Sequence, residues 1–164
     1  MRSIFCDLLF VKRYIMKTIA TFLIVLVSFC AFAQHTDYNL KKGYAAEGYD
    51  VTAYFENKAI EGDTKFSTTY DGVKFKFISQ ANLDLFKADP EKFAPQYGGY
   101  CAYAVAVKGE KIGVDPKTFE IRDGKLYLFY NSWGVNTLEK WKEEGANTLQ
   151  GQADAAWTDI KDKS

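Results

Sequence analysis

The sequence predicts a small α+β domain, with two β-hairpins and a central strand flanked by short helices and a C-terminal amphipathic helix. Two hairpin patterns and a set of helix-start signals carry this prediction. In each hairpin pattern, apolar residues alternate with polar ones on both sides of a two-residue turn, Asp71-Gly72 in one and Asp123-Gly124 in the other. Asp-Gly favours such a turn because both of its residues must take positive φ.

The strands of these hairpins are predicted from period-two alternation, which places every second side chain on one face of a sheet. A further short strand-like run extends from Val51 to Phe55. The alternating residues are Phe66, Thr68, Tyr70, Val73, Phe75 and Phe77 in the first hairpin, and Phe119, Ile121, Leu126, Leu128 and Tyr130 in the second.

Helices are predicted where a capping residue precedes a helical spacing of apolar residues. Ser79 is a cap of this kind, Asp89-Pro90 places an acceptor before a first-turn proline, and Asn136 to Glu139 resembles a capping box. The last amphipathic helix is marked by Leu149, Ala153, Trp157 and Ile160.

A central strand is predicted from Tyr100 to Val107, directly after the break at Gly98-Gly99. On a strand, Cys101 and Tyr103 would face one side and Tyr100 the other. Glycines lack a Cβ, so they allow a backbone or a ligand to approach that strand end closely.

The N-terminus has the pattern of a secretory signal peptide. A basic start precedes an apolar run from Ile19 to Phe29, which is too short to span a bilayer, and Ala31-Phe32-Ala33 supplies a small-x-small cleavage pattern. An uncleaved membrane anchor is the alternative. We expect a leader and signal peptide over residues 1–33, a mature start near residue 34, and a periplasmic or secreted product that meets the membrane only before cleavage.

Beyond the leader, we expect a flexible tail over residues 34–46 and one domain over residues 47–161. From Gln34 onward the chain has 17 Lys and Arg residues against 20 Asp and Glu residues, a formal net charge of −3. This charge does not favour a nucleic-acid partner. Cys101 is the one cysteine after the leader, so no intrachain disulfide is expected.

Cys101 is the residue with most chemical potential in the domain. Its thiol could be a metal ligand, a redox group or a nucleophile, or it could be a small buried hydrophobe. The domain contains no histidine that would activate a nucleophilic thiol, because His35 lies in the predicted tail. Asp50, Asp115 and the tyrosines remain as oxygen ligands.

We predict a ligand pocket close to Cys101, walled by phenols. Tyr103 is the expected partner of the thiol, and Tyr49 or Tyr54 would reach the site from another element. Cys101 is the candidate ligand for a transition metal ion such as copper. The candidate binding residues are Tyr97, Gly98, Gly99, Tyr100, Cys101, Tyr103, Tyr49, Asp50 and Tyr54.

Three motifs within residues 48–105 resemble the YHS domain family in its exported bacterial branch. They are "DVTAYF" from Asp50, "SQANLDLFKADP" from Ser79 and "YGGYCA" from Tyr97. The resemblance continues more loosely over residues 114–131. It implies a domain of the kind that occurs beside copper-transporting ATPases and in some hydroxylases, where it is presumed to bind metal through cysteines.

The cysteines of the metal-associated branch are replaced in this chain. Ala53 stands where that branch has the cysteine of D-P-V-C, Ile78 where it has the cysteine of Y-H-F-C-S, and Asn82 where it has a further cysteine. These three side chains are not copper ligands, which leaves Cys101.

Three functional hypotheses follow. The leading one is a non-enzymatic exported module that binds a metal ion or a small ligand near Cys101. The second is a thiol-dependent redox protein that uses Cys101, and the third is a structural or interaction domain without a ligand. An exposed thiol of low pKa would favour the second, and a buried one the third.

Overall fold

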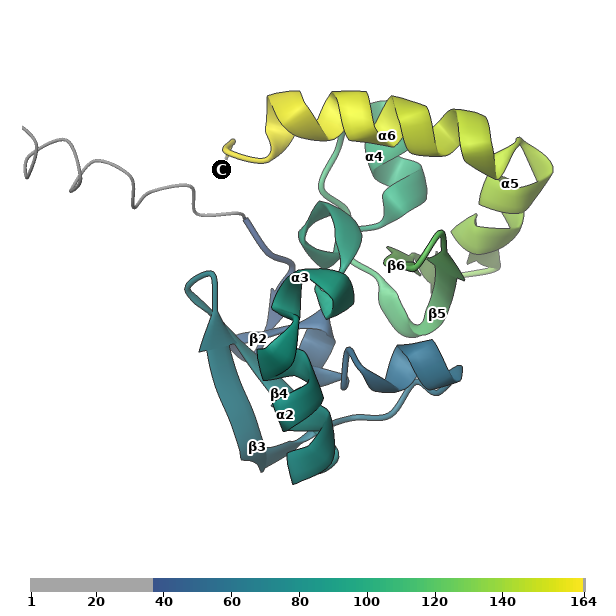
Figure 1. Ribbon diagram of the computed structural model, residues 1–164. Helices are drawn as coiled ribbons and strands as arrows, with labels where there is room; N and C mark the ends of the chain where they lie inside the picture. The colour runs from purple at the N-terminus through teal and green to yellow at the C-terminus, as the bar shows by residue number, and fades with distance from the viewer. Residues whose placement is uncertain (1–36, 164) are drawn as a thin grey trace, which may run out of the picture. The chain divides into compact units, whose positions relative to one another are not determined.

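Both predicted hairpins are present in the computed structural model, which describes residues 37–163 (Figure 1). Each joins two antiparallel strands at its Asp-Gly turn. The φ angles are 49° at Asp71 and 76° at Gly72, and 51° at Asp123 and 71° at Gly124. Two successive residues with positive φ are what a two-residue hairpin turn requires, so the predicted turn chemistry is confirmed.

The described residues contain both strands and helices, and the predicted α+β class is confirmed. The elements in chain order are β1 (Leu40–Lys41), β2 (Tyr44–Ala45), η1 (Ala46–Gly48), η2 (Ala53–Glu56), β3 (Asp63–Tyr70), β4 (Val73–Phe77), α2 (Gln80–Ala88), α3 (Pro90–Phe93), η3 (Gln96–Gly99), α4 (Ala102–Lys108), β5 (Asp115–Arg122), β6 (Lys125–Phe129), β7 (Asn131–Ser132), β8 (Val135–Asn136), α5 (Thr137–Glu143) and α6 (Ala146–Ile160).

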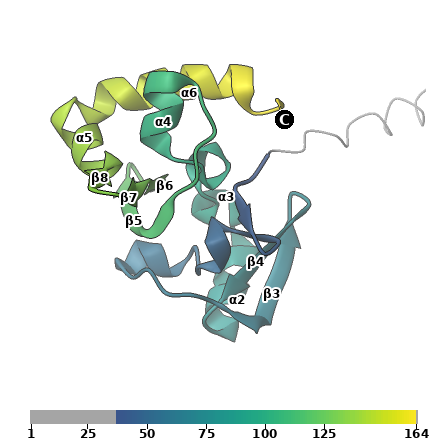
Figure 2. The same ribbon diagram turned by 180° about the vertical axis from the view of Figure 1, so that it is seen from behind.

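The strands form one four-stranded sheet and two separate hairpins. The sheet has the order β1-β2-β4-β3, in which β2 and β4 are parallel and the other pairs are antiparallel. β5 pairs with β6, and β7 pairs with β8. Both views show α4, α5 and α6 gathered on the opposite side of the β5–β6 hairpin from the four-stranded sheet (Figures 1 and 2).

Strand β6 separates two hydrophobic cores. Leu126 and Leu128 point into the first core, which lies against the four-stranded sheet, α2 and α3. Tyr127 and Phe129 point into the second core, which α4, α5 and α6 cover. Strand alternation sends successive side chains to opposite faces, so one strand contributes to both cores.

The predicted helix starts are also confirmed. The Ser79 hydroxyl accepts a hydrogen bond from the backbone N–H of Asn82 at the start of α2, and the Asp89 carboxylate accepts one from Lys92 N–H at the start of α3. Asn136 caps α5 in the same way. The C-terminal helix α6 buries Leu149 and Ala153 in the second core.

The central strand predicted after Gly98-Gly99 is wrong, because residues 102–108 form helix α4. Alternating alanine and valine satisfy the strand pattern, but the buried residues Ala102 and Val105 lie three apart, which is a helical spacing. Gly109 then ends the helix in the left-handed region, with φ of 62°. Cys101 itself keeps an extended conformation and forms an isolated bridge to Leu128 of β6.

The segment predicted as a tail is part of the fold where the structure describes it. Within residues 37–46, β1 and β2 pair with each other and β2 joins β4. Tyr38 is 7% exposed and packs edge to face on Phe75, so it anchors this segment in the first core. The strand-like run Val51–Phe55 forms a turn and η2 instead of a strand, because the Asp50 side chain binds its backbone.

The predicted signal peptide and its cleavage site lie outside the described residues. Within residues 37–163, no helix is both long enough and apolar enough to cross a membrane.

The turn at Gly124 yields a stability prediction with a matched control. A Cβ at Gly124 or at Gly113 would meet no atom within 4 Å, but Gly124 has a positive φ and Gly113 does not. We therefore expect Gly124→Ala to lower the free energy of unfolding by about 1–2 kcal/mol, through backbone strain alone. Gly113→Ala should leave it unchanged or raise it by about 0.5 kcal/mol. Urea unfolding measures both, and equal effects of the two substitutions would contradict the turn assignment.

Candidate functional site

The structure distributes the predicted site residues over several places instead of one pocket. Cys101 and Tyr103 border a cavity beside α4, which we call the α4 cavity. The remaining residues lie elsewhere: Tyr97 and Tyr100 against α6, Gly98 and Gly99 against residues 37–39, Tyr49 and Tyr54 at a second pocket, and Asp50 in the interior.

Cys101 is fully buried at the floor of the α4 cavity, where its thiol belongs to a closed hydrogen-bond network. The Thr137 hydroxyl donates its one hydrogen to the carbonyl of Tyr130 at 2.7 Å. In the 3.3 Å contact between this hydroxyl and the Cys101 thiol, the thiol is therefore the donor. The backbone N–H of Tyr130 donates back to the sulfur at 3.4 Å. The thiol thereby joins the start of α4 to the end of β6 and the start of α5.

The α4 cavity has a volume of about 390 Å³, within the usual range of small-molecule sites. Its walls are mostly apolar or aromatic, and two lysines also line it. Tyr103 is held in place because its hydroxyl donates to the Glu144 carboxylate at 2.8 Å, and this hydrogen bond raises the pKa of Tyr103. The lining residues are Cys101, Tyr103, Ala104, Lys108, Ile112, Tyr130, Val135, Thr137 and Lys140.

Tyr97 and Tyr100 do not face this cavity. The Tyr97 ring lies 6.0 Å from that of Trp157 on α6, and its hydroxyl donates to the Asp154 carboxylate at 2.8 Å. Burial, together with this hydrogen bond, raises the pKa of Tyr97. Tyr100 also packs near Trp157, with its hydroxyl 3.3 Å from the Asp37 carboxylate. Both phenols therefore attach α6 and the N-terminal segment to the domain.

The double glycine allows a close approach of backbone, not of a ligand. Asn39 N–H donates to the Gly98 carbonyl at 2.9 Å, and its side-chain amide donates to the Gly99 carbonyl at 3.2 Å. A Cβ added at Gly98 would lie 2.0 Å from the Asp37 carbonyl oxygen. Any side chain at that position would displace the N-terminal segment.

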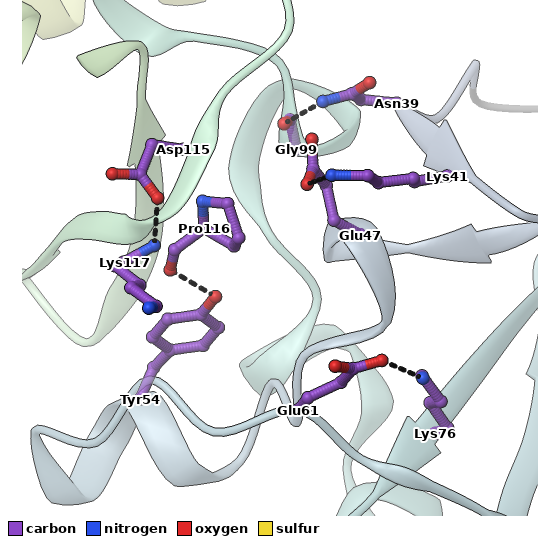
Figure 3. Close-up of polar contacts among 10 residues, drawn as sticks. All are labelled: Asn39, Lys41, Glu47, Tyr54, Glu61, Lys76, Gly99, Asp115, Pro116 and Lys117. Atoms are coloured by element: carbon purple, nitrogen blue, oxygen red, sulfur yellow. Dashed lines mark hydrogen bonds and ion pairs between the residues drawn. The ribbon is translucent and has the colours of Figure 1, made fainter. Parts of the chain in front are cut away.

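Tyr49 and Tyr54 lie at or near a second pocket of about 510 Å³, and Figure 3 draws the polar contacts of several of its lining residues. Tyr49 lines this pocket, whereas Tyr54 is buried beneath it and donates its hydroxyl to the Pro116 carbonyl at 2.7 Å. Burial raises the pKa of Tyr54. The lining residues are Lys41, Lys42, Tyr44, Glu47, Tyr49, Glu61, Thr64, Lys76, Asp115 and Pro116.

The charges of this second pocket are largely neutralised by one another. Lys41 pairs with Glu47 at 2.5 Å, and Lys76 pairs with Glu61 at 2.8 Å (Figure 3). The hydrogen bond from Lys76 lowers the pKa of Glu61. The Asp115 carboxylate accepts from Lys117 N–H at 3.0 Å. A ligand would have to compete with these pairs, which makes this pocket the weaker candidate.

Asp50 is a buried carboxylate that organises the loop before η2. It is 0% exposed and accepts five hydrogen bonds. One oxygen binds the backbone N–H and the hydroxyl of Thr52 and the N–H of Ala53. The other binds Ile78 N–H at 2.8 Å and the Asn82 side-chain amide at 2.7 Å. These bonds satisfy a buried charge that has no ion-pair partner among residues 37–163.

The positions of the absent cysteines converge on this carboxylate. Ala53, Ile78 and Asn82 each donate a hydrogen bond to Asp50. The donors available there are N–H groups already bound to a carboxylate, so the residues do not fit a thiolate metal site. Elsewhere in the described part of the chain, no three His, Cys, Asp or Glu side chains are grouped to hold a metal ion. Cys101 lies in the α4 cavity without a second soft ligand beside it.

Several lining residues of the α4 cavity were not anticipated from the sequence. Lys108 and Lys140 look like ordinary exposed residues near helix ends, and no sequence signal separates them from other lysines. Thr137 carried a signal, because it lies inside the predicted capping box, but its contact with Cys101 joins residues 36 positions apart.

The fold and the α4 cavity define a small α+β domain with a ligand-sized cavity. More particularly, residues 51–97 match the family model described as the YHS domain. This match supports the resemblance to that family predicted from the motifs. The match ends before Gly98 and Cys101. Comparisons with curated proteins and with solved structures gave no match.

The Asp50 network yields a prediction about the replaced cysteine positions. Asp50→Asn keeps the shape but leaves one acceptor oxygen for two sets of donors, so at least two buried N–H groups would lose their partner. We expect the free energy of unfolding to fall by about 2–4 kcal/mol. Asp63→Asn is the matched control, because the exposed Asp63 carboxylate accepts one backbone N–H, from Lys65, and its loss should change stability by less than about 1 kcal/mol.

Urea unfolding of both variants, with and without added Cu²⁺ or Zn²⁺, distinguishes a structural carboxylate from a metal ligand. The assignment would be contradicted if Asp50→Asn were as stable as the parent. It would also be contradicted if Cu²⁺ or Zn²⁺ stabilised the parent but not Asp50→Asn.

Proposed function

We propose that this chain is an exported, non-enzymatic binding module and that its ligand is a small organic anion held in the α4 cavity. The observation that carries the proposal is a cavity of about 390 Å³ whose lining is mostly apolar and includes two lysines. Such a combination suits a ligand with an apolar body and one anionic group. Export is supported by the leader pattern before residue 34.

The two lysines support an anionic ligand because neither forms an ion pair with a carboxylate of the described residues. Among residues 37–163, neither Lys108 nor Lys140 takes part in an ion pair, whereas Lys76 and Lys111 do. Lys108 lies at the end of α4 and Lys140 lies on α5, so the two ammonium groups come from different elements that border one cavity.

The metal and redox alternatives are less well supported. The donor set around Cys101 has no second soft ligand, and the Asp50 network occupies the positions of the absent cysteines. The Cys101 thiol is 0% exposed and fully engaged in hydrogen bonds, whereas a redox thiol must be reached by its partner.

Calorimetric titration with benzoate and its neutral analogue benzamide tests the proposal. We expect benzoate to bind and the Lys108→Gln/Lys140→Gln double variant to weaken that binding by about threefold to tenfold, since each exposed charge pair contributes up to about 1 kcal/mol. Benzamide binding should not depend on the two lysines.

The matched control is Lys74→Gln/Lys87→Gln, which removes two exposed lysines that also lack ion pairs but do not line the cavity. It should bind benzoate like the parent. An unchanged affinity in the double cavity variant would rule out charge recognition there. If neither probe binds at millimolar concentration, the cavity is not a site for this class of ligand, and an interaction domain becomes the better hypothesis.

A further inference from the structure

Trp133 is placed where a tryptophan is unfavourable for folding. It occupies the first position of the two-residue turn between β7 and β8, with φ of 53° at Trp133 and 75° at Gly134. Asparagine, aspartate and glycine are the usual residues at such positions, because a bulky side chain is strained at positive φ. The side chain is also 92% exposed, so its apolar surface is left in water.

No packing within the described residues compensates for this placement. Trp133 belongs to neither core and forms no aromatic pair, whereas Trp141 and Trp157 each contact several rings. A strained and exposed aromatic residue is a pointer to function when the fold does not account for it.

The hairpin that carries Trp133 also borders the α4 cavity. Val135, two residues further on, lines the cavity and is 38% exposed, and Tyr130 lines it just before β7. The Cα atoms of Trp133 and Val135 are separated by two peptide units and therefore lie within roughly 7 Å of each other. Trp133 is therefore carried by a hairpin that borders the cavity.

Helix α4 contributes a further exposed apolar side chain on the same side. With 100° of rotation per residue, Val107 points between the directions of Tyr103 and Ala104, both of which line the cavity, one turn earlier. Val107 is 43% exposed. Val107, Val135 and Trp133 are thus exposed apolar side chains on elements that border the cavity, and we call these three residues the rim.

From this geometry we infer that the anion bound in the α4 cavity has an extended aromatic body, and that Trp133 covers the part of it that projects past the rim. This inference rests on the proposed function and adds the class of ligand and a specificity-determining residue. The carboxylate is bound by Lys108 and Lys140, and the far ring contacts the indole face, which makes larger aromatic anions the better ligands.

Calorimetric titration with benzoate and 2-naphthoate tests the inference. The parent should bind 2-naphthoate about threefold to tenfold more tightly than benzoate, the range expected for one additional aromatic contact. Trp133→Ala should remove this preference while leaving benzoate affinity unchanged, and Trp133→Phe should retain part of it.

Trp133→Asn separates the role of the indole from that of the turn. Asparagine before glycine is favoured in a two-residue hairpin turn, so this variant should melt at a higher temperature than the parent and still lose the preference for 2-naphthoate. In the parent, naphthoate should shift the indole N–H resonance of Trp133, assigned with Trp133→Phe, and leave that of Trp157 in place.

The outcomes distinguish this inference from the proposed function. If benzoate binds through the two lysines and 2-naphthoate is not preferred, or is preferred equally by Trp133→Ala, the proposed function stands and the role of Trp133 is overturned. If neither anion binds, both are overturned. A Trp133→Asn variant that is more stable and retains the full preference would identify the residue as unrelated to the ligand.

Discussion

The burial of β6 on both faces is the constraint on which the rest of the domain depends. Leu126 and Leu128 belong to one core, and Tyr127 and Phe129 belong to the other, so both cores depend on side chains of this strand. A two-stranded hairpin alone is marginally stable in water, and here both of its faces are covered by other elements. The same strand receives Cys101 through the bridge at Leu128, which positions the start of α4 and with it the wall of the α4 cavity.

Two buried polar groups connect loops to the neighbouring elements through hydrogen bonds. Asp50 attaches the loop before η2 to the start of α2, and the Cys101 thiol attaches α4 to the segment between β6 and α5. In the first case five donors hold a carboxylate in the interior; in the second the sulfur contacts the Thr137 hydroxyl and accepts one hydrogen bond from Tyr130 N–H. Ala53, Ile78 and Asn82 thus belong to a hydrogen-bond network that gives this loop a structural centre.

Local signals in the sequence predicted the fold better than the site. The turns at Gly72 and Gly124 and the cap at Ser79 depend on neighbouring residues, and each formed as predicted. The helix after Gly99 was missed, because a short run of alternating alanine and valine fits both periods and tertiary packing decides between them. The cavity could not be predicted, since Lys108, Val135 and Lys140 come together only through the packing of α4, β8 and α5. Cys101 and Tyr103 line one cavity, but they lie at a helix cap and on that helix, not on one strand.

The burial of Cys101 has a consequence for the life of the protein outside a reducing compartment. Disulfide exchange requires a sulfur that another thiol or disulfide can approach, and the folded domain provides no such approach. In an unfolded molecule the Cys101 sulfur can be approached. Once it forms a disulfide with a second molecule, the chain can no longer refold into the hydrogen-bond network of Cys101, Thr137 and Tyr130. In an oxidising medium the Cys101 thiol therefore turns each unfolding event into a chance of irreversible loss. The lifetime of the protein there would be governed by its unfolding rate rather than by its equilibrium stability.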